Sequence, residues 1–559
     1  MRKSLLSEAI AVVAMGCRLP EADSPQAFWQ IIANGNSTIS EVPETWLNRE
    51  IYFDPQPGKT GKVYSTLGSI FDTQKIENEI ANYHFHEQFR SCDPLLKLAC
   101  IVSDEVVGQV VFPSGYDNYG IYLGGLRASD LSMDYILSRT IETAFELLRG
   151  LPEFTKLPAQ IQHEIVLRSI DEARRKYRNE NYWNCESPEF RLSDFVLDLR
   201  KMYGWTGAAY SVDAACASSL VAIDCAMTDI LAGKIQGALV GGISAMTMLT
   251  PILFSKNFAA TATLSRPFDA EADGMVGSMG VVFMFLKSLS NAERDGDEIL
   301  GLIRGVGISS DGRGKSLWAP RQEGELMAMK RAYRETSITP QQLNYLEAHA
   351  TSTSIGDCTE LKSIVNLLNC SQDDLLIDFQ QQQQQQNLTD DNLNSDLTYN
   401  NSSTELTESD VAAINVTNNR GNRKLAVGSV KANIGHAFEA AGFVGLMKVI
   451  QICRNKIIPP QINFSAFHSD FRDRQLPFFV PRELTRLEFG DDALMFGVDA
   501  FGVGGLNAHL IFEEYKKDKT PTAEQVQQPA NQNTSAMTRS PIAVLGIGCV
   551  YPHAFSVDQ

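Results

Sequence analysis

Apolar and polar positions alternate along this chain in two different ways. Short apolar runs such as GALVGG (residues 237–242) and LAVGSV (425–430) have the length and composition of buried strands. Longer segments such as SSLVAIDCAMTDILAG (218–233) repeat apolar residues at helical spacing. Strands and helices that follow one another in this way predict an α/β protein built in layers.

Three segments depart from this pattern. Residues 150–194 include the charged run RSIDEARRKYRNE (168–180) and predict an inserted surface helix. Residues 371–423 contain seven consecutive glutamines and few large apolar side chains, so we expect an exposed, disordered insertion. Residues 516–540 are polar and interrupted by proline, which is typical of a flexible linker.

The end of the chain repeats its beginning. Ile10, Val12, Gly16 and Cys17 have counterparts at the same spacing in PIAVLGIGC (541–549). Both stretches predict a buried strand followed by a turn, and a lone strand has nothing to pack against. We therefore interpret residues 1–8 as a short lead, 9–515 as one module, and 541–559 as the truncated start of a second, related module.

Composition and net charge exclude several classes of function for this chain. A chain of 559 residues with 44% hydrophobic residues can bury a large core. Its net charge of -18 argues against nucleic acid or an anionic membrane as a partner. The ten cysteines show neither CxxC pairs nor zinc-type spacing, so we expect no metal site, no disulfide framework and a reducing cytoplasm. No secretory signal or membrane span is evident.

Cys216 is the first candidate catalytic residue. In SVDAACASSLVAIDC a strand-like run ends at Cys216, and a helical pattern begins directly after it. The unpaired amides at a helix N-terminus favour thiolate over thiol, so this position predicts a lowered pKa and a nucleophile. The competing interpretation is a buried cysteine that acts as a small apolar side chain.

Two histidines and a glycine-rich loop add to this candidate. His349 follows an apolar strand, and Gly356, Asp357 and Glu360 open the next helix. His436 follows another strand and loop, five residues after Lys431. Each histidine alone could be structural. The loop FGVGG (501–505) exposes backbone amides suited to an oxyanion, or is a plain tight turn.

These motifs together resemble the β-ketoacyl synthases, the decarboxylating condensing enzymes of fatty-acid and polyketide assembly. The resemblance covers residues 9–515 apart from the two insertions. It rests on DAACASSL, EAHATST..GD..E, K.NIGH, FGVGG.NAH and SRPFDAEADG, in the order typical of the family. A thiolase would need a second cysteine near its C-terminus, where this chain has Asn507 and His509.

The resemblance implies a thiolase-like fold, with two similar α/β halves stacked in five αβαβα layers. It also implies decarboxylative Claisen condensation of a Cys-bound acyl chain with malonyl-acyl carrier protein, giving a β-ketoacyl product and CO2. The domain would bind no cofactor of its own, because its substrates are carried on the phosphopantetheine of the carrier protein. The expected partners are acyl carrier protein and either a second copy of this chain or a chain-length-factor-like domain.

The same resemblance assigns roles to individual residues. The catalytic set would be Cys216, His349 and His436, supported by Asp357 and by Lys431 paired with Glu360. The backbone N–H groups of Cys216 and Val503 would hold the tetrahedral oxyanion. Thr351 and Thr353 would hydrogen-bond the pantetheine arm.

Several positions depart from the commonest family motifs: Met279 stands for glutamate, Ala350 and Ser352 for glycines, Cys358 for proline, Leu506 for threonine, and Val503 for a gating phenylalanine. The HATST variant is similar to synthases of polyunsaturated-fatty-acid and glycolipid assembly lines, where a chain-length factor often follows. The departures in the closing loop and at Met279 keep open a non-elongating module that binds acyl chains or scaffolds the dimer. A decarboxylase without condensation is a third possibility. The run 168–180 is either a carrier-protein docking patch or a solvated helix face.

Overall fold

The computed structural model describes residues 8–90, 92–125, 146–176, 192–312, 318–334, 336–375, 424–487 and 492–517. The chain divides into two units, Met1–Tyr515 and Lys516–Gln559. The predicted disordered insertion beyond Leu375, most of the predicted linker, and the predicted second module at 541–559 lie outside the described residues, as does the lead before Glu8.

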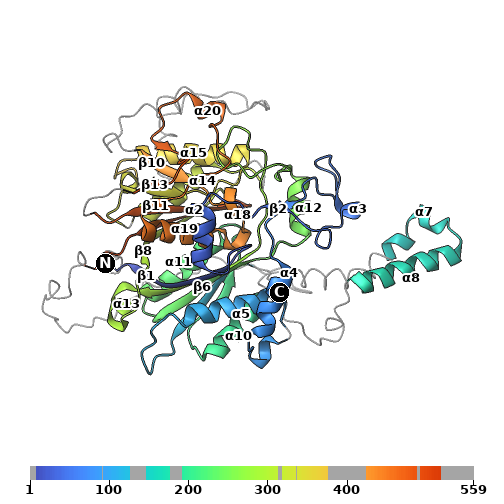
Figure 1. Ribbon diagram of the computed structural model, residues 1–559, viewed down its shortest axis with the longest axis horizontal. Helices are drawn as coiled ribbons and strands as arrows, with labels where there is room; N and C mark the ends of the chain where they lie inside the picture. The colour runs from blue at the N-terminus through green and yellow to red at the C-terminus, as the bar shows by residue number, and fades with distance from the viewer. Residues whose placement is uncertain are drawn as a thin grey trace, which may run out of the picture. The chain divides into compact units, whose positions relative to one another are not determined.

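The first unit, drawn in Figure 1 with many of its helices and strands labelled, repeats one strand order twice. The first half orders its strands β1-β7-β6-β4-β5 and the second β8-β15-β14-β9-β10, with β12 added at the outer edge. In each half the first three strands pair antiparallel and the remaining pairs are parallel. The strands are β1 (Ile10–Arg18), β4 (Tyr119–Gly124), β5 (Ala209–Val212), β6 (Gly237–Ser244), β7 (Gly280–Ser288), β8 (Gly301–Ser310), β9 (Tyr345–Glu347), β10 (Leu425–Gly428), β12 (Phe478–Phe479), β14 (Met495–Gly502) and β15 (Leu506–Glu513).

Two short ladders and a set of helices complete the unit. The ladders join β2 (Ser40–Glu41) to β3 (Leu67–Gly68) and β11 (Ile457–Ile458) to β13 (Thr485–Arg486). The α-helices are α2 (Pro25–Ala33), α3 (Arg49–Tyr52), α4 (Thr73–Asn82), α5 (Pro94–Val107), α7 (Pro152–Thr155), α8 (Ala159–Lys176), α10 (Leu192–Tyr203), α11 (Ser218–Leu231), α12 (Leu249–Lys256), α13 (Leu289–Asp295), α14 (Gln322–Arg334), α15 (Ser354–Asn369), α18 (Lys431–Ile434), α19 (Ala441–Asn455) and α20 (Ser469–Arg472). Single 3₁₀ turns are η1 (Glu87–Phe89), η2 (Pro340–Gln342) and η3 (Phe438–Ala440).

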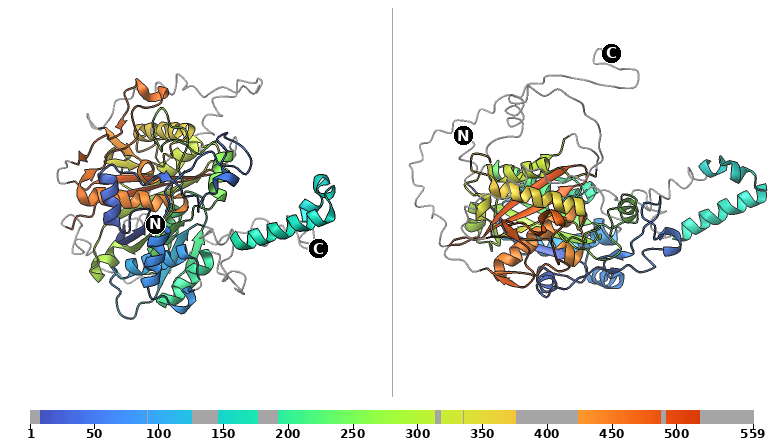
Figure 2. Two further views of the ribbon diagram at one scale, coloured as in Figure 1. Left: turned by 45° about the vertical axis from the view of Figure 1, so that its right-hand side comes forward. Right: turned by 90° about the horizontal axis from the view of Figure 1, so that it is seen from above.

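Helices cover both faces of each half and give five layers. Helices α5 and α10 contact the outer face of the first half, and α14 contacts β8 and β15 on the outer face of the second. Helix α15 packs against α14, and in Figure 2 the yellow helices of this layer are seen beside the orange strands of the second half. Helices α11 and α19 lie between the halves, because each contacts strands of both. The predicted αβαβα thiolase-like fold, with two similar halves, is confirmed.

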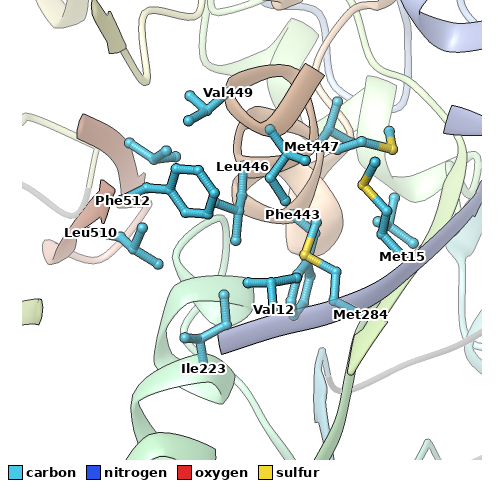
Figure 3. Packing of buried hydrophobic residues seen from close by; sticks show 14 of the residues in the cluster. Val12, Met15, Ile223, Met284, Phe443, Leu446, Met447, Val449, Leu510 and Phe512 are labelled. Carbon is cyan, nitrogen blue, oxygen red and sulfur yellow. The ribbon is translucent and has the colours of Figure 1, made fainter. Parts of the chain in front are cut away.

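The central helices are apolar on several sides because both of their neighbours are sheets. Phe443 and Leu446 of α19 pack with Val12 of β1 and Phe512 of β15, as Figure 3 shows. Ile223 of α11 belongs to the same buried cluster. Burial of a large apolar side chain contributes about 1.5–3 kcal/mol, so this middle layer holds the two halves together.

The inserted stretch after residue 150 is helical, as predicted, as far as it is described. Helix α8 ends at Lys176, and its side chains are described only up to Ser169. Phe154 and Val166 form a small separate cluster in this part of the chain. The candidate docking run 168–180 is therefore described at Arg168 and Ser169 alone, and the side chains of Arg174 and Arg175 lie outside the description. None of the described helices combines the length and apolar character that a membrane span needs.

Candidate active site

Cys216 lies in a strained turn between β5 and α11. Ala215, directly before it, adopts a left-handed conformation with φ of 49°, which is costly for a residue with a side chain. The hydroxyl of Ser218 holds this turn: it donates to the carbonyl oxygen of Ala215 at 2.6 Å and accepts from the N–H of Ala214 at 2.8 Å. The predicted helix after Cys216 is confirmed, since α11 begins at Ser218.

The second half of the fold brings both predicted histidines to Cys216. His436 Nε2 lies 3.0 Å from Cys216 Sγ. The rings of His349 and His436 stand edge to face with centroids 5.3 Å apart. The Nδ1 atoms of both rings are buried and have no hydrogen-bond partner among the described residues. Cys216 lies more than a hundred positions from either histidine in the sequence, so only the fold can assemble the three.

Buried carboxylates fix the two histidine loops. Glu360 of α15 accepts the backbone N–H groups of His349 and Ala350, each at 2.7 Å. Ser429 links the loops, because its hydroxyl donates to the carbonyl oxygen of Ala350 at 2.9 Å. Asp357 accepts the N–H of Phe268 at 2.8 Å, which ties the start of α15 to the SRPFD segment.

Glu347 and Lys448 are functional candidates that the sequence interpretation missed. Glu347, at the end of β9, accepts the N–H of Val430 at 2.6 Å and pairs with Lys448 Nζ at 2.7 Å. Both side chains are almost completely buried. Glu347 could have been noticed in the sequence, because it is a charged residue at the end of an apolar strand, two residues before His349. Its pairing with Lys448 on α19 could not have been predicted from the sequence.

The expected pairing of Lys431 with Glu360 needs correction. No ion pair joins them in the described part of the chain, and the carboxylate of Glu360 is occupied by backbone N–H groups instead. Lys431 is buried, which lowers its pKa, while the charges of Glu347 and Glu360 oppose this shift. The positive charge of Lys431 therefore acts on Cys216, His349 and His436 through space, without a direct ion pair to Glu360.

A cavity of about 480 Å³ leads to these groups. Cys216, His349 and His436 line it together with Thr351, Thr353 and Val503. The backbone N–H groups of Val503 and of Cys216 itself both point to the sulfur. Gly502 lets the 501–505 loop lie close to the turn that carries Cys216, because a Cβ at this position would lie 2.6 Å from the carbonyl oxygen of Ala214. Among the described residues, no cluster of histidine, cysteine or carboxylate side chains is arranged to hold a metal ion.

Comparison with known proteins decides the family. The model of the β-ketoacyl synthase N-terminal domain matches residues 7–126 and 199–292, and that of the C-terminal domain matches 300–378 and 400–465. Together they match more than half of the chain. The chain belongs to the β-ketoacyl synthase family. It is thus an acyl-transferring enzyme of the condensing class.

Several curated relatives are polyketide synthases. The chain is 26% identical over 91% of its length to a phenolphthiocerol/phthiocerol polyketide synthase polypeptide of Mycobacterium tuberculosis, of which it spans 28%. It is 27% identical over 92% of its length to polyketide synthase ThaG of Burkholderia thailandensis, of which it spans 8%. The chain thus corresponds to a small part of each of these relatives.

Solved ketosynthases share the fold. The ketosynthase from module 6 of the bacillaene synthase of Bacillus subtilis 168 superposes with a TM-score of 0.65, at 23% identity over 91% of this chain and 72% of the other. The oxazolomycin ketosynthase domain OzmH KS7 of Streptomyces albus JA3453 superposes with a TM-score of 0.64, at 22% identity over 91% of this chain and 74% of the other.

The electrostatics of the ketosynthase site differ from the sequence-based expectation at one point. Burial raises the pKa of the Cys216 thiol to about 12, and the charge of Glu439 adds to this, so the predicted lowering is wrong. Desolvation of the thiolate outweighs the backbone N–H groups of Val503 and Cys216 and the charge of Lys431, which act in the opposite direction. Burial and the charge of Lys431 hold the pKa values of His349 and His436 well below their usual range. The site therefore contains a neutral thiol beside two neutral imidazoles.

One departure from the family motif carries backbone strain. Ser352, at a position where glycine is common, has φ of 67°, a region that favours glycine. Its Oγ accepts the N–H of Arg266 at 2.8 Å, and its carbonyl oxygen accepts the N–H of Gly274 at 2.7 Å. These bonds offset the strain and keep Thr351 and Thr353 at the cavity.

Proposed function

We propose that this chain forms a carbon–carbon bond by decarboxylative Claisen condensation between an acyl group on Cys216 and a malonyl thioester of an acyl carrier protein. The observation that carries the proposal is the 3.0 Å contact between Cys216 Sγ and His436 Nε2, with the His349 ring beside it in one cavity. The products would be a β-ketoacyl-acyl carrier protein and CO2.

In the first step, Cys216 accepts the acyl chain from a pantetheine thioester. The thiol gives its proton to His436 Nε2 as the sulfur attacks, because a neutral imidazole at hydrogen-bond distance can act as a general base. The C–S bond of the incoming thioester breaks, and its sulfur leaves with that proton. The N–H groups of Cys216 and Val503 hold the tetrahedral oxyanion, each donor contributing about 10²- to 10³-fold in rate.

In the second step, the bond between the carboxylate and the α-carbon of the malonyl group breaks and CO2 leaves. The electron pair moves onto the thioester oxygen, where an N–H group of His349 stabilises the enolate. His436 adds a second N–H once its single ring proton has moved from Nδ1 to Nε2. The α-carbon then attacks the acyl carbonyl, and Cys216 leaves as a thiolate that takes up one proton. Neutral histidines suit this task because each can donate one hydrogen bond without a competing positive charge.

The carrier protein and the partner belong to the same proposal. Thr351 and Thr353 line the cavity and would hydrogen-bond the phosphopantetheine arm, so no cofactor resident in the domain is needed. Strand β5 lies at the end of the strand order, and Tyr210 on it is partly exposed. We infer that this edge joins a second copy or a ketosynthase-like partner. The similarity to polyketide synthases favours a polyketide or related lipid pathway, located in the cytoplasm.

The deciding experiment combines acylation and turnover. The purified chain would receive acyl-carrier protein and then malonyl-carrier protein, with intact-protein mass and product analysis as readouts. We expect an acyl adduct that disappears when malonyl-carrier protein is added, and neither adduct nor product for Cys216→Ala. Full condensation by Cys216→Ala contradicts the proposal. A stable adduct without turnover would instead indicate a non-elongating acyl-binding module.

A further inference from the structure

The two histidines of the site are attached to different halves of the fold. The N–H of His436 donates to the carbonyl oxygen of Val276 at 2.7 Å, and its carbonyl oxygen accepts from the N–H of Ser278 at 2.9 Å. Val276 and Ser278 lie just before β7, in the same half as Cys216. His349 follows β9 of the second half. Contacts between the segments that carry the two histidines therefore fix the spacing of their rings.

The backbone ladder between these two segments stops before it reaches either ring. Strands β9 and β10 pair in parallel, and their last pair is Glu347 with Gly428. After this pair, one chain leads to His349 and the other leads to α18 and His436. Beyond the ladder, side chains join the two segments.

Glu347 makes one of these links. Its Oε1 accepts the N–H of Val430 at 2.6 Å, directly before α18. Its Oε2 accepts the hydroxyl of Tyr345 at 2.6 Å and pairs with Lys448 Nζ at 2.7 Å. The side chains of Glu347 and Lys448 are only 2% and 4% exposed. The carboxylate is thus held on one side by two donors, and its other oxygen stays directed at Val430.

The two side-chain links differ in strength. The second link, from the Ser429 hydroxyl to the carbonyl oxygen of Ala350 at 2.9 Å, joins two neutral groups. The N–H of Ser429 is accepted at 2.7 Å by Gln461, which belongs to neither histidine segment. Hydrogen bonds to an ionised group are about twice as strong as those between neutral groups. Glu347 therefore supplies the stronger of these two links between the segments.

We propose that Glu347 is a positioning residue that holds His349 at its spacing from His436. It acts in the condensation step and not in the acylation of Cys216. Acylation uses the contact of Cys216 with His436, which the first half holds on its own. The enolate is stabilised beside His349, so condensation depends on the spacing that Glu347 fixes. This division of steps rests on the proposed condensation, whereas the link itself can be tested without it.

Two double variants isolate the bond to Val430. In Glu347→Gln/Lys448→Met the amide oxygen can still accept the N–H of Val430, and neither member of the ion pair leaves an unpaired charge behind. Glu347→Ala/Lys448→Met has the same net charge but no acceptor for this N–H. The difference between the two variants therefore reports the link rather than the loss of the ion pair.

Asp297→Ala is the matched control. Asp297 resembles Glu347, because its Oδ1 accepts a backbone N–H, that of Val111, at 2.8 Å and its Oδ2 pairs with Lys287 Nζ at 2.6 Å. The side chains of Asp297 and Lys287 are as buried as those of the Glu347 pair. Lys287 keeps Asp295 as a partner in this variant. Asp297 does not line the cavity, so its loss should lower the Tm alone.

The rates of the two steps test the positioning role. Glu347→Ala/Lys448→Met should acylate Cys216 as fast as the glutamine variant and condense about tenfold more slowly, the size of one lost buried hydrogen bond. Asp297→Ala should change neither rate. Equal condensation by the two double variants, or acylation that falls in proportion to condensation, overturns the positioning role. If the alanine variant does not fold, Glu347→Asp replaces it in comparison with wild type, because it keeps the charge on a side chain one methylene shorter.

Hydrogen exchange, read by peptide mass, tests the link itself. In peptides covering 345–353 and 428–436, backbone amides should exchange faster in Glu347→Ala/Lys448→Met than in the glutamine variant. Asp297→Ala should leave both peptides unchanged. Equal exchange in the two double variants overturns the link. A wild type that does not condense refutes the proposed function, and the exchange comparison then still decides whether Glu347 joins the two segments.

Discussion

Ser429 joins the loops that carry the two histidines, because its hydroxyl donates to the carbonyl oxygen of Ala350 at 2.9 Å. Removal of this buried bond by Ser429→Ala should leave the carbonyl oxygen without a donor and lower condensation about fivefold to tenfold, as expected for a loss of about 1–1.5 kcal/mol. Steady-state kinetics with carrier-protein substrates measures this. Ser103→Ala, which also loses a buried hydroxyl, should lower stability without changing the rate. An equal rate loss in both variants contradicts the prediction.

Glu439 should control the reactivity of the Cys216 thiol. Its charge raises the pKa of Cys216, and its own pKa is raised to about 7 by burial, so the effect is greatest above pH 7. Glu439→Gln should therefore shift the alkylation of Cys216 by iodoacetamide to lower pH, read by peptide mass between pH 7 and pH 10. An unchanged alkylation profile would mean that this charge does not reach the sulfur.

The same variant should change the pH dependence of folding. A carboxyl whose folded pKa is raised above its unfolded value contributes stability at low pH that is lost as pH rises through the folded pKa, here from about 4.5 to about 7. Glu439→Gln lacks this loss, so its Tm should fall less than that of the wild type between pH 5 and pH 8. Thermal unfolding followed by circular dichroism measures the difference, and parallel curves argue against it.

The buried pair of Glu347 and Lys448 predicts a strongly non-additive double-mutant cycle. Lys448→Met leaves an uncompensated carboxylate in the core and should lower the free energy of unfolding by about 3–5 kcal/mol. Combining it with Glu347→Gln removes that charge and should restore part of the loss. Urea denaturation of the four proteins gives the coupling. Additive effects would show that the two side chains are independent in solution.

Gly502 is expected to be essential for the approach of the 501–505 loop to Cys216. A Cβ at this position would lie 2.6 Å from the carbonyl oxygen of Ala214, so Gly502→Ala should displace the Val503 N–H from the sulfur. We expect a loss of about 10²-fold in kcat, the size associated with one oxyanion donor. Gly233→Ala, at a turn with open space around its Cα, should cost stability alone. Normal turnover by Gly502→Ala would exclude this loop from the reaction.

The sequence could predict whatever depends on local pattern. The helix after Cys216, the strand before His349, and the helix containing Asp357 and Glu360 all follow from apolar spacing and are confirmed. The family motifs identified the fold, which periodicity alone could not have distinguished from other α/β arrangements. The layered packing of α11 and α19 likewise follows from their apolar character on more than one side.

Properties that depend on burial and on contacts between distant segments could not be predicted from the sequence. The pKa of Cys216 moves opposite to the expectation because the sulfur is enclosed by segments from both halves, which no local pattern encodes. Glu347 pairs with Lys448, about a hundred residues away, and no local pattern in the sequence connects the two.

The duplicated strand order has a consequence for how activity can be lost. The Cys216 sulfur belongs to the first copy of the arrangement, whereas both imidazoles and the Val503 amide belong to the second. Truncation or local unfolding of either copy would therefore abolish activity rather than reduce it. A fragment ending near Asp295 and a fragment starting at Gly301 should each be inert, and any activity regained on mixing them would report that the copies had rejoined.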